Sequence, residues 1–261
     1  MKPVVGSAIE RDGDGRLPPG MRVLLPGIPG VTSRGYLGYC SIILFELDHG
    51  CIGLFDTGHY SDRNCLLAAL DKACARREDI RVVILSHLHF DHILNLPLFP
   101  EAEVFVSKAE IEYAKQVLTH ERVDNSVPDF WPALLADHVL HEVGETHELD
   151  HRYNLVCYPG HTPGGLVMLY QGVETTAVCG DVIKNAWEAV KGESTMAVSA
   201  DAAAKSIHAL MAQAKIIVPG HDRPFRHFQG EIKYLMPFSW EVCTSLYPEP
   251  ANKSELLIQI D

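Results

Sequence analysis

Short apolar runs alternate with turn residues through the first half of the chain. The runs 40–47 and 51–56 flank an Asp-His-Gly turn, a pattern that predicts a β-hairpin. Apolar residues at helical spacing then predict a helix that begins at Ser61 or Asp62 and continues to about Arg76.

The rest of the chain continues this alternation of strand and helix patterns. Residues 119–137 are the exception, since their prolines and aromatic residues fit no strand pattern, and we expect an inserted loop with a short helix there. Hairpins followed by strand–helix units predict α/β layers built on mixed sheets. The pattern predicts strands at 81–85, 103–106, 138–143, 153–158, 166–170, 175–179 and 216–219, and helices at 108–118 and 200–214.

Length and composition favour one globular domain. The chain has 261 residues, of which 47% are hydrophobic and 21% charged, and no Gly/Ser-rich or Pro-rich linker divides it. A chain of this size can bury a sizeable core without disulfide bonds or structural metals. We therefore interpret 1–261 as a single domain, with an N-terminal arm or loop at 1–20.

The net charge and the lack of apolar targeting segments indicate which partners and which compartment to expect. The formal net charge of −12 disfavours long nucleic acids as partners. No apolar stretch is long enough for a signal peptide or a membrane span. The 7 cysteines are scattered singly, as expected of reduced thiols. We expect a cytoplasmic protein that acts on a small molecule and contacts no membrane.

The 14 histidines are the unusual feature of the composition, and three of them gather in one short segment. His87, His89, Asp91 and His92 stand directly after the predicted strand 81–85. His87 and His89 lie on the same side of an extended segment, whereas Asp91 and His92 can serve a second metal. Imidazole nitrogen and carboxylate oxygen are ligands that zinc and similar cations prefer. This spacing predicts a metal site rather than a solvated loop.

Three later turns each place one potential ligand beside glycine at the end of a predicted strand. Glycine permits the tight turn and the close backbone approach that aim a side chain inward. The candidates are His161 in a Pro-Gly-His-Thr-Pro-Gly turn, Asp181 after a glycine, and His221 in Pro-Gly-His. Together with the histidine-rich segment they suit two cations that share one carboxylate and keep an open position, as in catalytic sites.

These motifs, in this order, resemble those of the metallo-β-lactamase superfamily. The resemblance rests on HxHxDH, PGHTPG, Gly-Asp and Gly-His, with an Asp-Thr-Gly turn that begins at Asp56, and it covers about residues 40–225. It implies an αββα sandwich, in which two mixed sheets carry helices on their outer faces. It also implies two divalent metal ions, with zinc expected and iron or manganese as alternatives.

The resemblance gives each ligand a role. A hydroxide that bridges the two metals would attack a carbonyl or phosphoryl centre. Asp91 would act as the catalytic residue that orients this hydroxide and moves its proton. Asp56 has two open interpretations, a hydrogen bond to a ligand or turn amide and a buried turn-capping role. The implied ligand sets are His87, His89 and His161 for one metal, Asp91, His92 and His221 for the other, and Asp181 between them.

Local sequence separates the branches of the superfamily. β-Lactamases generally lack a bridging carboxylate where Asp181 stands, glyoxalase-like thioesterases add a C-terminal helical domain, and RNA-processing nucleases add a domain and a basic surface. The segment 86–92 is most similar to that of small single-domain lactonases such as N-acyl homoserine lactonases, so we expect hydrolysis of a small ester or lactone. Residues 95–100 and 219–225 also look similar to small metallo-β-lactamase-domain proteins of animals, which implies phosphodiester or ester hydrolysis.

Residues near these motifs are candidates for substrate binding. Lys184 stands where the lactonases carry a tyrosine, and we expect either a contact to a substrate anion or oxyanion or a solvated surface lysine. Phe130 and Trp131 in the insertion, together with Trp187, are candidates for the walls of an apolar cleft, with packing onto the domain as the alternative. His59 follows the Asp-Thr-Gly turn and is the last candidate.

Three other functions share most of these ligands. They are a phosphodiesterase that uses Lys184 on a small diester, a mononuclear iron dioxygenase acting on a thiol or persulfide, and a non-catalytic metal-bearing sensor. The sensor is the least favoured because the ligand set is complete. The apolar tail 256–260 is consistent with a homodimer contact.

Overall fold

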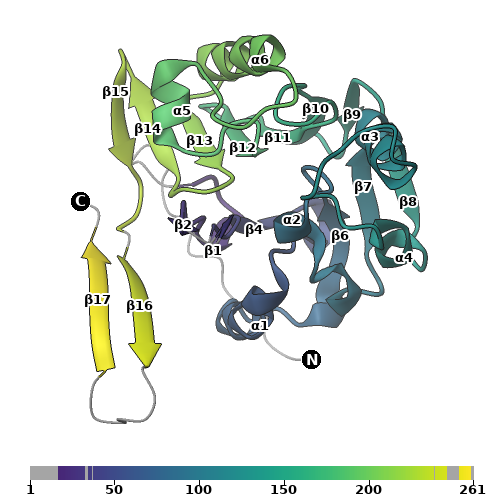
Figure 1. The fold of residues 1–261 in the computed structure, drawn as a ribbon, viewed down its shortest axis with the longest axis horizontal. Coiled ribbons are helices and arrows are strands. Elements are labelled where there is room, and N and C mark those ends of the chain that lie inside the picture. Colours follow the sequence, from purple (N-terminus) through teal and green to yellow (C-terminus); the bar gives the residue numbers. More distant parts are fainter. Residues whose placement is uncertain (1–16, 33–34, 37, 238, 246–252, 260–261) are drawn as a thin grey trace.

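The protein is described by a computed structural model that covers residues 17–32, 35–36, 38–237, 239–245 and 253–259. Two large β-sheets pack face to face, and helices cover their outer faces (Figure 1). The predicted αββα sandwich is therefore confirmed. The predicted arm at 1–20 falls outside the described residues except for 17–20.

The first large sheet is mixed. Its strands, in spatial order, are β1 (Met21–Leu25), β4 (Ile42–Glu46), β5 (Ile52–Phe55), β6 (Ile80–Ile84), β7 (Glu103–Ser107) and β8 (Leu140–Val143). β4 and β5 form the predicted antiparallel hairpin, and β5 to β8 run parallel. Parallel strands end at the same edge of a sheet, so the segment that follows β6 lies at an edge where several loops meet.

The second large sheet is mostly antiparallel. Its strands, in spatial order, are β15 (Glu231–Tyr234), β14 (Phe225–Phe228), β13 (Ile216–Pro219), β12 (Thr176–Gly180), β11 (Leu166–Tyr170), β10 (Tyr153–Cys157) and β9 (Thr146–Glu148). Only β12 and β13 pair in parallel. Two small hairpins complete the strands: β2 (Val31–Thr32) with β3 (Gly35–Tyr36), and β16 (Ser239–Ser245) with β17 (Lys253–Gln259).

Three layers of buried apolar side chains hold the sandwich together. Strand alternation divides β4, because Ile43 and Phe45 pack between the sheets while Ile42 and Leu44 pack under helices. The helices are α1 (Arg63–Lys72), α2 (Phe90–Ile93), α3 (Lys108–Leu118), α4 (Trp131–Leu135), α5 (Ala186–Lys191) and α6 (Ala200–Gln213). α1, α3 and α4 cover the first sheet, and α5 and α6 cover the second (Figure 1).

Several boundaries differ from the predictions. α1 ends at Lys72 rather than Arg76, because Cys74 takes a left-handed backbone with φ of 57° that a right-handed helix cannot continue. The sequence pattern does not predict α2, α5, β1, β2, β3, β9, β14, β15, β16 or β17. Most of these have three to six residues, too few for a periodic pattern to emerge.

The structure also bears on the membrane and on the C-terminal tail. Within the described residues, no helix is both long and apolar enough to cross a membrane. The predicted dimer contact at 256–260 lies outside the residues whose side chains the structure describes.

Candidate metal centre

The histidine-rich segment lies at the carboxyl end of β6, where the chain turns into α2. His87 and His89 precede the helix, and their ring centroids are 4.4 Å apart. Asp91 and His92 lie within α2, which places Asp91 Oδ2 3.8 Å from His92 Nε2. One strand end and one helical turn thus bring four potential ligands to a single edge of the first sheet.

The other three candidates follow strands of the second sheet. His161 follows β10, Asp181 follows β12, and His221 follows β13. Because β12 and β13 are parallel, Asp181 and His221 leave the sheet at the same edge. Close backbone approach is required there, since a Cβ atom on Gly220 would lie 2.2 Å from Asp181 Oδ1.

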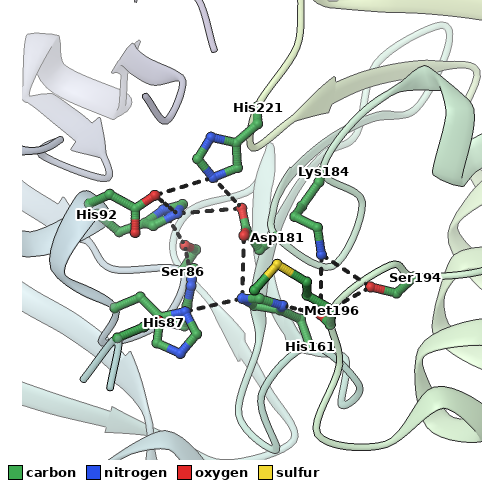
Figure 2. Close-up of polar contacts among 12 residues, drawn as sticks. Ser86, His87, His92, His161, Asp181, Lys184, Ser194, Met196 and His221 are labelled. Carbon is green, nitrogen blue, oxygen red and sulfur yellow. Dashed lines mark hydrogen bonds and ion pairs between the residues drawn. The ribbon is translucent and has the colours of Figure 1, made fainter. Parts of the chain in front are cut away.

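The seven candidates meet in two groups that share one carboxylate. Figure 2 shows this carboxylate, Asp181, between His161 and His221. Within each group the potential ligand atoms lie within 4.8 Å of one another. Asp181 joins the groups, with Oδ2 3.3 Å from His161 Nε2 and Oδ1 3.1 Å from His221 Nε2. This is the arrangement that the family resemblance implies. The first ligand group is His87, His89 and His161, and the second ligand group is Asp91, His92 and His221.

Burial and unused polar atoms indicate that these groups suit metal cations. All seven side chains are buried, and none is more than 8% exposed. Nε2 of His87 and Nε2 of His92 are buried without a hydrogen-bond partner among the described residues. Such nitrogens are costly to bury unless a cation binds them. The residues therefore fit divalent cations that prefer nitrogen and oxygen ligands.

Protonation also favours metal binding. Burial lowers the pKa of His161 to about 3 and holds the pKa of His87 well below its usual value. Neutral imidazole is the form that binds a cation. Burial opposes ionisation of Asp181, but the neighbouring histidines His221, His161 and His92 hold the pKa of its carboxyl well below the usual value.

Asp56 fixes the histidine-rich segment from the end of β5. Its Oδ1 accepts the backbone N–H of Ser86 at 2.7 Å, and its Oδ2 accepts the Ser86 hydroxyl at 2.8 Å. The same Oδ2 lies 2.7 Å from His92 Nδ1. Asp56 therefore orients a ligand and satisfies a turn amide, which confirms the first of its two interpretations.

Asp124, in the insertion 119–137, orients His89. Its Oδ2 lies 3.0 Å from His89 Nε2 and accepts the Tyr113 hydroxyl at 2.8 Å. His89 Nδ1 lies 3.1 Å from His161 Nε2, so the opposite ring nitrogen faces the first ligand group. Sequence reasoning missed Asp124 because it belongs to no motif; an acidic residue inside the insertion was the available signal.

Backbone carbonyls orient the two histidines of the second sheet. His161 Nδ1–H donates to the Met196 carbonyl at 2.6 Å, and His221 Nδ1–H donates to the Tyr39 carbonyl at 3.0 Å. A carbonyl only accepts, so each hydrogen bond places the ring proton on Nδ1 and leaves the Nε2 lone pair toward the ligand groups.

A pocket with a volume of about 240 Å³ opens onto both ligand groups. Its wall combines metal-ligand candidates with apolar and uncharged polar residues, and Lys184 is the one lysine or arginine among its lining residues. The lining residues are Pro29, Gly30, His89, Phe90, Asp91, Ser126, His161, Asp181, Lys184, Asn185, Thr195, Met196 and His221.

Lys184 is buried, at 6% exposure, so its interpretation as a solvated surface lysine is wrong. Its Nζ lies 3.1 Å from Glu188 Oε1 and contacts residues of the loop that follows α5 (Figure 2). The paired carboxylate explains why this ammonium is found inside the protein.

The other substrate-binding candidates lie outside the pocket wall. Trp131 is 6% exposed and belongs to the buried apolar layer between the first sheet and its helices, which corrects its assignment to a cleft wall. Tertiary packing places this ring in the core although its loop looks irregular in sequence. Phe130 and Trp187 are about half exposed and do not line the pocket. His59 is half-buried and packs against Phe90, which does line it.

Comparison with known proteins gives a family match over most of the chain. Residues 35–221 match the model of the metallo-beta-lactamase superfamily. Metallo-beta-lactamase domain-containing protein 1 of Mus musculus is 31% identical over 241 residues, which cover 87% of this chain and 80% of the relative. The Homo sapiens protein of the same name is 31% identical over 235 residues, which cover 85% of this chain and 76% of the relative.

Solved structures share the fold at lower sequence identity. A metallo-beta-lactamase-type protein from Thermotoga maritima has a TM-score of 0.64 at 20% identity, with 79% of this chain and 98% of that chain covered. A variant of AiiA from B. thuringiensis, solved with N-decanoyl-L-homoserine at its active site, has a TM-score of 0.59 at 18% identity, with 71% and 82% covered. From its fold, its ligand groups and its relatives, this chain belongs to the metallo-beta-lactamase superfamily.

Proposed function

We propose that this chain is a zinc-dependent hydrolase of small, uncharged esters or lactones. The pocket carries the proposal, because it opens onto both ligand groups while its one ammonium is already paired with a buried carboxylate. Apolar parts of the pocket wall come from Phe90, Met196 and Pro29. A neutral substrate with an apolar part fits such a wall better than a bare phosphate does.

Asp91 is the residue that we assign to proton transfer. It lies in the second ligand group, lines the pocket, and has Oδ2 3.4 Å from His221 Nε2. Two divalent cations, when bound by the ligand groups, would supply Lewis-acid activation of water and of the ester carbonyl. The Asp91 carboxylate orients the attacking water, accepts its proton and returns that proton to the leaving oxygen.

A phosphodiesterase has less support from this site. The proposed phosphodiesterase uses Lys184 as its phosphate contact, but the three acceptors around Lys184 Nζ already use its three donors. Lactone hydrolysis has the added support that AiiA, a structural neighbour, was solved with N-decanoyl-L-homoserine at its active site.

The test is a metal and substrate panel. Chain loaded with zinc, iron or manganese would be assayed on aryl esters, γ-lactones, a bis-aryl phosphate and a persulfide with oxygen-uptake detection. We expect ester or lactone turnover that a chelator abolishes and zinc restores. Asp91→Asn should lower kcat by about 10²- to 10⁴-fold, the range for loss of a positioned acid–base group.

Each other outcome favours a different function. Turnover of the bis-aryl phosphate alone would favour the phosphodiesterase, and iron-dependent oxygen uptake alone would favour the dioxygenase. Zinc binding without turnover of any substrate would favour the sensor. Pairing of two copies through 256–260 stays a prediction, which light scattering on the intact chain would test.

A further inference from the structure

The surroundings of Lys184 differ from those of a substrate-binding lysine. Its Nζ lies 3.1 Å from Glu188 Oε1, 3.2 Å from Ser194 Oγ and 3.2 Å from the Met196 carbonyl oxygen. An ammonium group has three N–H donors, and three acceptors surround this one. A substrate anion would therefore have to displace an existing partner.

Both carboxylate oxygens of Glu188 also have hydrogen-bond partners within the protein. The side chain is completely buried, and its Oε2 accepts the backbone N–H of Lys184 at 2.9 Å. Its Oε1 accepts the backbone N–H and the hydroxyl of Thr195 at 2.9 Å and 3.0 Å, and the Ser194 hydroxyl at 3.3 Å. The ion pair thus ties α5 to the loop 194–196.

The same loop supplies the carbonyl that orients a metal ligand. The Met196 oxygen accepts from His161 Nδ1 at 2.6 Å while it also accepts from Lys184 Nζ (Figure 2). The Met196 side chain is 61% exposed, so little apolar burial fixes this residue. Two backbone hydrogen bonds hold the following residues to the His161 turn, from Val198 N–H to the His161 carbonyl and from Ser199 N–H to the Gly160 carbonyl, both at 3.1 Å. On the N-terminal side of Met196, residues 194–196 are held by the contacts of Lys184 and Glu188, and these contacts help to fix the carbonyl and with it the orientation of His161.

We propose that Lys184 and Glu188 form a positioning pair for the first ligand group, and that neither side chain contacts the substrate. The pair holds the Met196 carbonyl where it keeps the proton of His161 on Nδ1 and the Nε2 lone pair toward the cation site. This inference rests on the metal centre of the proposed function but not on the substrate.

The test is zinc affinity, measured by competition with a chromogenic chelator. Lys184→Met and Glu188→Gln remove one charge each and keep much of the side-chain volume. Each should weaken zinc binding by about 10- to 100-fold, the range for loss of groups that orient metal ligands. Lys191→Met and Glu193→Gln are matched controls, because both residues are exposed on or just after α5, and they should leave zinc affinity unchanged.

The kinetic constants of Lys184→Met distinguish a residue that positions a metal ligand from one that contacts the substrate. With any hydrolysed ester, Lys184→Met should lower kcat at saturating zinc and leave KM within about twofold. A raised KM with unchanged zinc affinity would overturn the proposal and identify Lys184 as a substrate contact. Unchanged zinc affinity in both variants would also overturn it, whether or not an ester is hydrolysed, so this failure differs from failure of the proposed function.

A milder variant covers the case in which the charge changes prevent folding. Ser194→Ala removes one hydroxyl from a half-buried position, and thermal unfolding of the metal-free chain would verify that it folds. Zinc affinity should then fall a few-fold in the same direction. A folded Ser194→Ala protein with full zinc affinity would contradict the proposed role of the loop.

Discussion

In the N-terminal half of the metal centre, side chains hold the ligand histidines: Asp56 contacts His92, and Asp124 contacts His89. In the C-terminal half, backbone carbonyls do so, that of Met196 for His161 and that of Tyr39 for His221. The two halves also differ in layout, since one continuous segment carries four ligands and three separate turns carry the other three.

This difference determines how each half can be altered. A side-chain acceptor can be removed by one substitution, so Asp56 and Asp124 act directly on their histidines. A carbonyl cannot be substituted, and only the residues that place it can change the C-terminal half. Lys184 and Glu188 are such residues, because their contacts with the loop 194–196 help to place the Met196 carbonyl.

The largest effect is expected where the halves meet. Asp181→Asn removes the carboxylate that lies between both ligand groups, so zinc affinity should fall by more than the roughly 100-fold upper range for groups that only orient ligands. Elemental analysis after dialysis against a weak chelator would measure the loss. Asp201→Asn, at an exposed site on α6, is the control. Full zinc content in Asp181→Asn would show that the halves bind metal independently.

The next largest loss of zinc affinity is expected from a change in the N-terminal half of the metal centre. Asp124→Asn should weaken zinc binding by about 10- to 100-fold, because the amide no longer provides a charged partner for His89. Asp129→Asn, an exposed acid in the same insertion, should have no effect. If Asp124→Asn and Asp129→Asn bind zinc equally well, side-chain positioning in this half would be refuted.

The stability of the fold should also depend on pH, through a carboxyl just before α1 and outside the ligand groups. Burial raises the pKa of Asp62, which accepts the His59 backbone N–H at 3.1 Å, to about 6. The folded state therefore keeps a proton that the unfolded state releases near pH 3.8, the usual value for this group. This stabilising contribution is complete below about pH 4 and is lost as the pH rises through about 6.

Asp62→Asn removes the titrating carboxyl and so isolates its contribution to stability. The free energy of unfolding of Asp62→Asn, relative to wild type, should rise by on the order of 1 kcal/mol between pH 4 and pH 7. Urea unfolding of the metal-free chain at several pH values would measure it. A difference between the two proteins that does not vary with pH would contradict the raised pKa.

The smallest effect is expected at the exposed aromatic residue of the insertion. Phe130 is 54% exposed and lies outside the pocket wall. Phe130→Ala should change the free energy of unfolding by no more than about 0.5 kcal/mol and leave KM unchanged. A marked rise in KM would restore Phe130 as a substrate contact.

The metal-ligand segments could be predicted from the sequence because each motif lies within a few consecutive residues. His87 to His92 carry the metal-binding pattern within one segment, and the glycine turns at His161 and His221 mark strand ends. The strands and longer helices followed from apolar periodicity for the same reason. Short α5 still carried end signals, since Asn185 caps its first turn and Gly192 ends it with a left-handed φ of 70°.

The supporting contacts could not be predicted, because they depend on how distant segments pack. The carbonyls of Tyr39 and Met196 have no sequence signature, since every residue has a carbonyl. Lys184 and Glu188 stand at helical spacing, but their burial follows from packing of the loop 194–196. Trp131 is a core residue for a similar reason, since the apolar layer that buries it is built from segments far apart in the sequence.

Anomalous diffraction at the zinc absorption edge, from a crystal of the zinc-loaded chain, would show directly whether the two ligand groups bind metal. We expect two zinc peaks roughly 3.5–4 Å apart, as in other two-metal sites. One peak would lie among His87, His89 and His161, and the other among Asp91, His92 and His221, with Asp181 between them. A single peak, or zinc bound away from these side chains, would contradict this expectation.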